Sequence, residues 1–171
     1  MKTIGKIYLP IFLVVMNWIL VGRSFAQELR GIPMPKNVSE LLWSGKVDSA
    51  ISEFEVFKKA QSKTADPYDL LYVEMTVYRD AQMADVSKAE SYKAKYDALF
   101  QQILKKYPDR SDTYLLQVTP ESTPEQIIEL TTKAIKSDPT NWGAYQMRSR
   151  ALYQLGRNEE AAADAQKGQG L

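Results

Sequence analysis

Apolar residues recur every three or four positions along most of this chain, which is the period of a helix with one buried face. The longest such stripe lies between residues 92 and 107 and comprises Tyr92, Tyr96, Leu99, Phe100, Ile103 and Tyr107. Two shorter stripes comprise Ala50, Phe54 and Phe57, and Ile127, Ile128, Leu130, Ala134 and Ile135. Strand-like alternation is almost absent after Asn37. The pattern predicts an all-α protein, with helices of about 12 to 20 residues and short connections that favour antiparallel neighbours.

Polar residues that can accept a hydrogen bond from an unpaired backbone N–H stand before several of these stripes. In two places the acceptor precedes a proline, which fits the first helical position because that position needs no N–H. A Glu or Gln three residues after the acceptor adds the reciprocal bond of a capping box. These signals predict helices that begin after Asn37, Asp66, Ser87, Thr123 and Asn141. Asn37 also opens a glycosylation acceptor triplet, but we favour its interpretation as a cap.

The first 26 residues are typical of an export signal. Lys2 and Lys6 form a basic start without acids, and an apolar run follows over residues 7–21. Ser24 and Ala26 are the two small residues that a signal peptidase reads. The sequence therefore predicts that residues 1–26 are a signal peptide cleaved after Ala26, and that the protein is periplasmic or extracellular.

A retained membrane anchor over residues 7–21 is the alternative. A spanning helix needs about 20 apolar residues, whereas this run is shorter and contains Pro10 and Asn17. Arg23 is atypical just before a cleavage site, so the anchor stays open. With the signal removed we expect no membrane segment. Residues 27–36 predict an extended lead-in, and residues 37–171 predict one helical domain.

Glycine, alanine and proline occur at the ends and crossings of the helices predicted in the last third of the chain. Gly156 follows an apolar helix and suits the left-handed conformation that ends one. Ala161 is small, as required where two helices cross closely, and Pro139 interrupts the chain between helices. This pattern resembles the tetratricopeptide repeat, a helix–turn–helix unit of 34 residues.

A second, partial match lies near the start of the domain. Gly45 and Ala50 have the same five-residue separation as Gly156 and Ala161, and Pro108 precedes Pro139 by 31 residues. The resemblance implies antiparallel helix pairs stacked as a short right-handed solenoid of about three and a half to four units.

The chain departs from the family pattern in four ways. In the first unit, Pro33 and Pro35 shorten the leading helix. The third unit leaves room for only a turn or two of helix over residues 113–118. Ala165 and Gly168 stand where the family prefers larger or more helix-favouring residues. The usual polar capping helix is missing, which implies an open apolar end.

The resemblance implies a concave surface that takes a peptide or a partner helix. The register of the last unit turns four side chains toward it: Gln146, Arg150, Tyr153 and Gln154. Arg150 suits a carboxylate and Tyr153 a rigid amphipathic contact. We expect an interaction module that holds a protein or peptide partner without catalysis. The alternative is a structural domain that forms a homodimer through its uncapped end.

The amino-acid composition argues against several other functions. The chain has no cysteine and no histidine, so thiol chemistry, the usual general base and the commonest metal ligands are missing. Its 22 basic and 21 acidic residues create no strong field for nucleic acid. We expect no cofactor and no nucleic-acid partner.

Pairs of neighbouring acidic residues suggest a minor alternative function. Glu53 with Glu55, or Asp109 with Asp112, would serve a carboxylate-dependent enzyme or a small-ligand binder, although nothing in the sequence places either pair in a pocket. Two further charge runs, Arg148/Arg150 and Glu159/Glu160, are typical of solvated helix faces.

Overall fold

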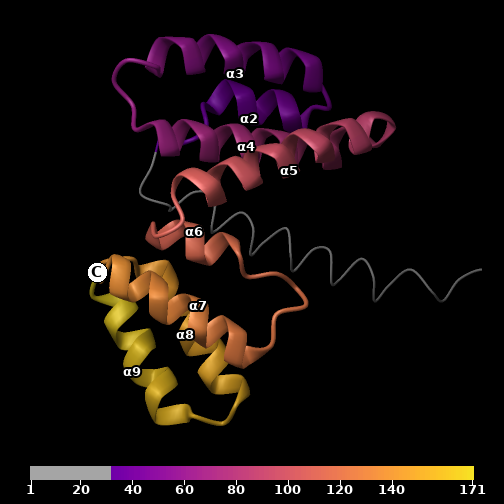
Figure 1. Ribbon diagram of the computed structural model, residues 1–171. Helices are drawn as coiled ribbons and strands as arrows, with labels where there is room; N and C mark the ends of the chain where they lie inside the picture. The colour runs from indigo at the N-terminus through magenta and orange to yellow at the C-terminus, as the bar shows by residue number, and fades with distance from the viewer. Residues whose placement is uncertain (1–31) are drawn as a thin grey trace, which may run out of the picture.

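The computed structural model describes residues 32–171, and in this range all regular structure is helical (Figure 1). The prediction of an all-α fold is therefore confirmed. The predicted signal peptide, and the lead-in up to residue 31, lie outside the described residues. Within residues 32–171, eight α-helices and one 3₁₀ turn follow in chain order: α2 (Lys36–Trp43), α3 (Val47–Gln61), α4 (Pro67–Ala84), η1 (Val86–Lys88), α5 (Ala89–Lys106), α6 (Ser111–Leu116), α7 (Pro124–Ser137), α8 (Trp142–Gln154) and α9 (Asn158–Gln169).

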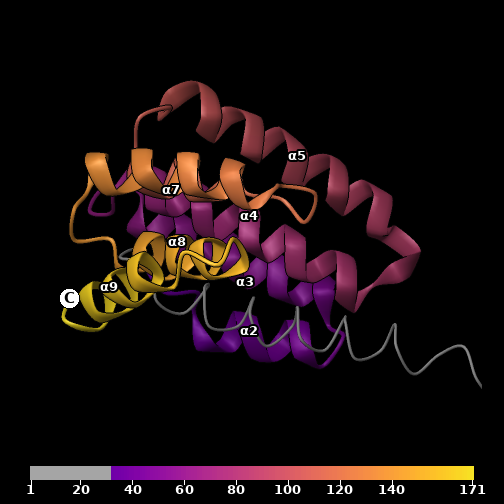
Figure 2. The same cartoon turned by 90° about the horizontal axis from the view of Figure 1, so that it is seen from below.

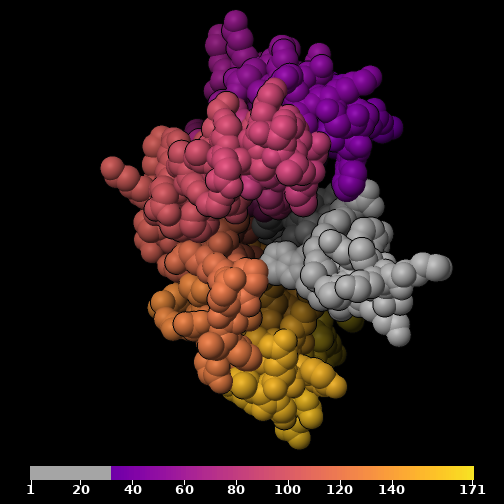
Figure 3. Space-filling model, turned by 90° about the vertical axis from the view of Figure 1, so that its right-hand side faces the viewer, coloured from indigo at the N-terminus to yellow at the C-terminus, as the bar shows by residue number. Residues whose placement is uncertain are grey.

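The helices pack as sequential antiparallel pairs, α2 with α3, α4 with α5, α6 with α7 and α8 with α9. The pairs follow one another through the molecule in chain order, from the indigo first pair to the yellow last pair (Figure 3). Contacts between α7 and α8, and between α3 and α4, join consecutive pairs. Figure 2, seen from below, shows α7, α8 and α9 nearest the viewer, in front of the longer α4.

Three buried clusters hold the pairs together. The largest joins α2, α3, α4 and the start of α5, and includes Phe54 and Tyr92. The second lies between α4 and α5, where Tyr68 and Ile103 are buried and Leu116 of α6 packs against them. The third joins α6, α7 and α8 around Ala134. The predicted stripes thus supply the core, because each helix buries its apolar face against a neighbour.

Three of the five predicted helix starts are confirmed. The Asp66 carboxylate accepts a bond from the N–H of Tyr68 at 2.8 Å. Thr123 forms a complete capping box with Gln126 before α7. Asn141 accepts from the N–H of Ala144 before α8.

The other two starts were predicted wrongly. α2 begins at Lys36, because the carbonyl of Pro35 already accepts from the N–H of Ser39 at 3.1 Å. Asn37 therefore lies inside the first turn, and its amide donates to Glu53 instead. Ser87 is not the cap of α5, because Asp85, two residues earlier, binds the Ser87 N–H and directs these residues into η1.

Gly45 and Gly156 end α2 and α8 in the same way. Both have positive φ, 73° and 72°. After each, the next N–H bonds back to a carbonyl five residues earlier, from Lys46 to Leu41 at 2.9 Å and from Arg157 to Leu152 at 3.0 Å. This is the Schellman closure, which needs a left-handed residue. Five residues further on, Ala50 and Ala161 are buried against the preceding helix.

Replacing Gly156 by alanine is expected to cost about 1–2 kcal/mol of unfolding free energy, because a left-handed residue with a Cβ is strained. Nothing lies within 4 Å of the added methyl, so the cost is conformational and not steric. Gly170 is the matched control, since its φ of −91° suits any residue. Urea unfolding monitored by circular dichroism separates the two, and equal losses in both variants would contradict the assignment.

Candidate functional site

The four side chains predicted to contact a partner all lie on α8. The opposite face of this helix is buried through Ala144, Tyr145, Ala151 and Leu152. The predicted set lies on the other face, with Arg150 and Gln154 exposed and Gln146 half-buried. Tyr153 is 70% exposed, which is unusual for a large aromatic side chain. The structure thus leaves an amphipathic surface on α8, which we call the α8 face: Gln146, Arg150, Tyr153 and Gln154.

Arg150 differs from the other arginines of residues 32–171. Each of the others pairs with a carboxylate: Arg79 with Asp80, Arg110 with Asp66, Arg148 with Asp164 and Arg157 with Glu160. Arg150 has no ion pair within the described range. A guanidinium offers five donors in a planar fork. Arg150 therefore retains its full donor capacity for a group outside residues 32–171.

The crossing of α8 and α9 holds the α8 face in place. Arg148 binds both carboxylate oxygens of Asp164, at 2.7 and 2.8 Å, and also donates to Thr132 of α7. The interaction with Asp164 raises the pKa of Arg148 above its usual value. The Ser149 hydroxyl donates to the carbonyl of Ala161 at 2.7 Å. These bonds fix α9 along α8.

One expectation about this crossing was wrong. Arg148 was predicted to lie on a solvated face, but its bidentate bond to Asp164 places it between the two helices. Gly168, noted in the sequence as a departure from the family pattern, permits close packing here. A Cβ at Gly168 would stand 3.3 Å from the Cβ of Tyr145 and 3.4 Å from the carbonyl of Trp142. The absence of a side chain lets α9 lie directly on α8.

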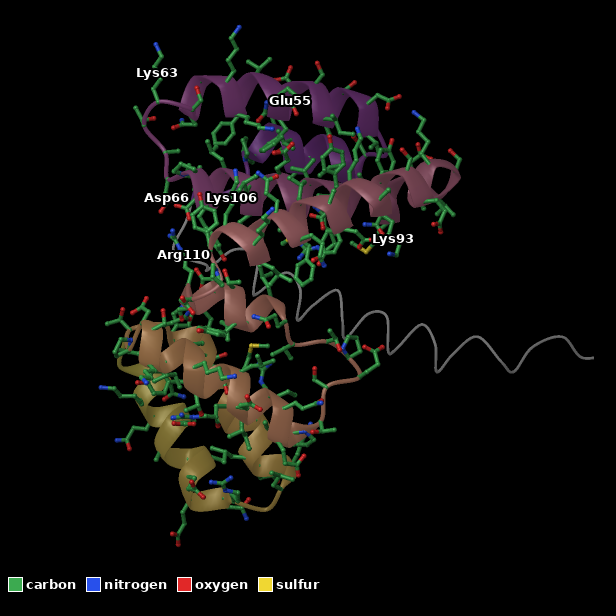
Figure 4. The ribbon with its side chains drawn as sticks, in the orientation of Figure 1. Glu55, Lys63, Asp66, Lys93, Lys106 and Arg110 are labelled. Carbon is green, nitrogen blue, oxygen red and sulfur yellow. The ribbon has the colours of Figure 1, made fainter. Side chains whose placement is uncertain are left out.

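A row of polar contacts links the N-terminal ends of α4, α6 and α8. Arg110, just before α6, donates to Asp66 at 2.7 Å, lies 3.6 Å from Asp69 and stacks over the Tyr68 ring at 4.2 Å. Figure 4 shows Asp66 and Arg110 together at the end of α5 that carries Lys106. Arg110 thus connects the second helix pair to the third.

Asn141 makes the corresponding link one pair later. Its amide donates to the Ser111 hydroxyl at 2.9 Å and to Asp112 at 2.8 Å. Ser111 in turn donates to the carbonyl of Ala134 at 2.9 Å. Arg110 and Asn141 are 31 residues apart, the same separation as Pro108 and Pro139. The proline spacing was found in the sequence, but these contacts were missed. A polar residue two positions after each proline, Arg110 after Pro108 and Asn141 after Pro139, was the signal that could have indicated them.

The charges around Arg110 predict an acid-dependent change in stability. The hydrogen bond from Arg110 lowers the pKa of Asp66 below its ordinary 3.8, so this carboxylate stabilises the fold above pH 3.8 and the contribution is lost as the pH falls further. Burial raises the pKa of Asp69, which acts in the opposite direction. We therefore expect Asp66→Asn to lose less stability below pH 4 than the wild type.

The effect of Asp66 stays below about 1 kcal/mol because its side chain is partly exposed. Asp69→Asn is the control and should lose stability more steeply on acidification. Chemical denaturation at several pH values between 3 and 6 measures both slopes, and a reversed order of the two variants would contradict this account.

The acid pairs named as catalytic candidates make contacts with neighbouring side chains. Glu53 accepts from Asn37 at 3.1 Å, and Glu55 lies 3.9 Å from Lys58. Asp109 accepts from the Tyr114 hydroxyl at 3.1 Å. Within residues 32–171, acidic residues do not gather in groups of three that could hold a metal ion. Every helix in the same range is too short or too polar to span a bilayer.

Comparisons with known proteins add no family. No protein-family model matches the chain, and no curated protein is significantly similar to it. Function is therefore inferred from the α8 face and from the packing that supports it.

Proposed function

We propose that this chain is an exported interaction module that holds a protein or peptide partner on the α8 face and catalyses no reaction. The observation that carries the proposal is that Tyr153 and Arg150 are both exposed on one side of a helix whose opposite side is buried. Tyrosine and arginine are the residues that most often dominate binding energy in protein interfaces. A rigid helix also presents them at a low cost in conformational entropy.

We further propose that the four helix pairs form a short right-handed solenoid of the tetratricopeptide type. The closures at Gly45 and Gly156 support it, since each is followed five residues later by a buried alanine. The equivalent positions of Arg110 and Asn141 support it too. In such an arrangement the first helix of each pair lines the inner surface, which agrees with the partner-facing position proposed for α8.

Self-association through the last helix is the weaker candidate. The exposed side of α9 carries Ala162, Ala163 and Gln166. Leu171, two residues beyond the end of α9, is the one large exposed apolar residue between residues 158 and 171. This surface has little apolar area to bury between two copies. We therefore favour a different protein or peptide as the partner.

A photo-crosslinking amino acid at position 153 tests the site in cells that export the full chain. We expect it to form one reproducible adduct, and Tyr153→Ala to weaken the isolated complex by about tenfold. The control places the same crosslinker at Lys63, in the α3–α4 turn far from α8 (Figure 4). Equal labelling from both positions, or adducts only between copies of this chain, would overturn the proposal.

Export is tested by the N-terminal sequence of the protein recovered from those cells. Gln27 as the first residue supports cleavage after Ala26 and a periplasmic or extracellular location. A retained Met1 would instead support the anchor over residues 7–21.

A further inference from the structure

The buried core of residues 32–171 is divided between α5 and α6. The first two clusters belong to α2, α3, α4 and α5, and within this range Leu116 is the one apolar side chain of α6 to α9 that packs against them. The third cluster belongs to α6, α7 and α8. By contrast, the first cluster continues from α3 into α4, and the third from α7 into α8. We call α2–α5 the first half and α6–α9 the second half, and they lie one above the other in Figure 1.

The shortness of α6 explains this division. The helix has six residues, so it offers α4 and α5 about one and a half turns instead of a full apolar stripe. Two hydroxyls are buried at the boundary, on Tyr68 of α4 and on Thr113 of α6, and neither makes a hydrogen bond within residues 32–171. A buried hydroxyl without a partner costs free energy, which is recovered when water reaches it. The boundary is therefore short of apolar contacts and carries polar groups that favour hydration.

The connection between the two halves passes from one to the other at Pro108. Tyr107 belongs to the first half, because its ring packs in the second cluster and meets the Tyr68 ring edge-on at 5.3 Å. Asp109 belongs to the second half, because its carbonyl accepts from the hydroxyl of Ser137 in α7 at 2.7 Å. Pro108 lies between them and has no N–H to donate. Rotation about the backbone at this point moves one half relative to the other without breaking a helix.

Arg110 reaches back across this connection. Its carbonyl accepts from two N–H groups of α6, so its backbone belongs to the second half, and its N–H bonds to the carbonyl of Tyr107 at 3.3 Å. Its side chain instead binds the first half: it donates to Asp66 at 2.7 Å, lies 3.6 Å from Asp69 and stacks over the Tyr68 ring at 4.2 Å. Figure 4 shows Arg110 next to Asp66. These contacts must break before the halves can separate.

We propose that residues 107–110 form a hinge between the two halves and that the Arg110 side chain holds this hinge closed. In the open state each half keeps its helices and its own clusters, while the hydroxyls of Tyr68 and Thr113 gain water. The contacts of Arg110 are polar and partly exposed, so breaking them costs less than exposing an apolar cluster. Opening moves the α8 face relative to α4, whether or not that face binds a partner.

The absence of cysteine allows spin labels to be placed on two introduced cysteines. Val56→Cys with Ala163→Cys spans the hinge, and Val56→Cys with Met83→Cys lies within the first half; all three positions are exposed. Double electron–electron resonance measures both distances in protein recovered from cells that export the full chain. We expect Arg110→Ala to widen the distance distribution between positions 56 and 163 about twofold. The distribution between positions 56 and 83 should not change.

Arg157→Ala is the matched control, because Arg157 makes two bonds of 2.7 Å to Glu160 that lie entirely within the second half. It should leave the distribution between positions 56 and 163 unchanged. Asp66→Asn replaces Arg110→Ala should that variant not fold, since asparagine still caps α4 but removes the charge that Arg110 binds. No widening in the variant used, equal widening between positions 56 and 83, or the same widening in Arg157→Ala would show that Arg110 does not hold a hinge closed.

Discussion

Replacing Phe54 by alanine is expected to lower the unfolding free energy by about 3–5 kcal/mol, because it empties the centre of the largest cluster. Phe54 is buried on α3, stands 6.1 Å from the Phe57 ring, and shares its cluster with Val73 and Val77 of α4. The cavity would be lined by three different helices, which cannot close on it without shifting the first pair against the second.

Val56→Ala is the matched control for this prediction, since it shortens an exposed side chain on the same helix and should change stability by less than about 0.5 kcal/mol. Urea denaturation followed by far-ultraviolet circular dichroism measures both variants. If Phe54→Ala lost no more stability than Val56→Ala, the packing of α3 on α4 described above would be wrong.

Replacing Asp164 by alanine is expected to cost about 2–4 kcal/mol, because it leaves the Arg148 guanidinium between α8 and α9 without its carboxylate. Both side chains are largely buried, and two short hydrogen bonds would be lost. Hydrogen exchange should show the loss first in α9, which depends on this crossing for its position.

Glu160→Ala is the matched control, because Glu160 also makes two bonds of 2.7 Å to an arginine, but on the exposed surface. An exposed pair contributes about 0–1 kcal/mol. Replacing Arg148 and Asp164 together by leucine should recover most of the loss from Asp164→Ala, because no unpaired charge remains. A double variant as unstable as the single one would show that the pair supports the crossing in some other way.

The local features of this protein were the predictable ones. Asp66, Thr123 and Asn141 cap helices as expected, because a cap acts on an N–H two or three residues away and needs nothing else from the fold. The short third unit also agrees with the sequence, since α6 ends at Leu116. The wrong prediction at Asn37 shows the limit of such local signals. The helix begins earlier, after Pro35, and the Asn37 side chain donates a hydrogen bond to Glu53, sixteen residues away.

The contacts that support the candidate site were less predictable. Arg148 and Arg150 are two residues apart and looked alike in the sequence, yet one is paired between helices and the other is exposed. The difference depends on Asp164, sixteen residues later and on a different helix. Arg110 reaches Asp66 across 44 residues. No local sequence pattern predicts such ion pairs, because the partners meet only after the helices have packed.

Helical class, the order of helices and their glycine closures were determined by the sequence alone, because period, caps and left-handed residues act over a few neighbouring positions. Tertiary structure decided which charges are paired, and that Tyr153 remains exposed on the α8 face. Burial and ion pairing depend on what a distant segment brings to the same place, so they follow from the packing of the pairs.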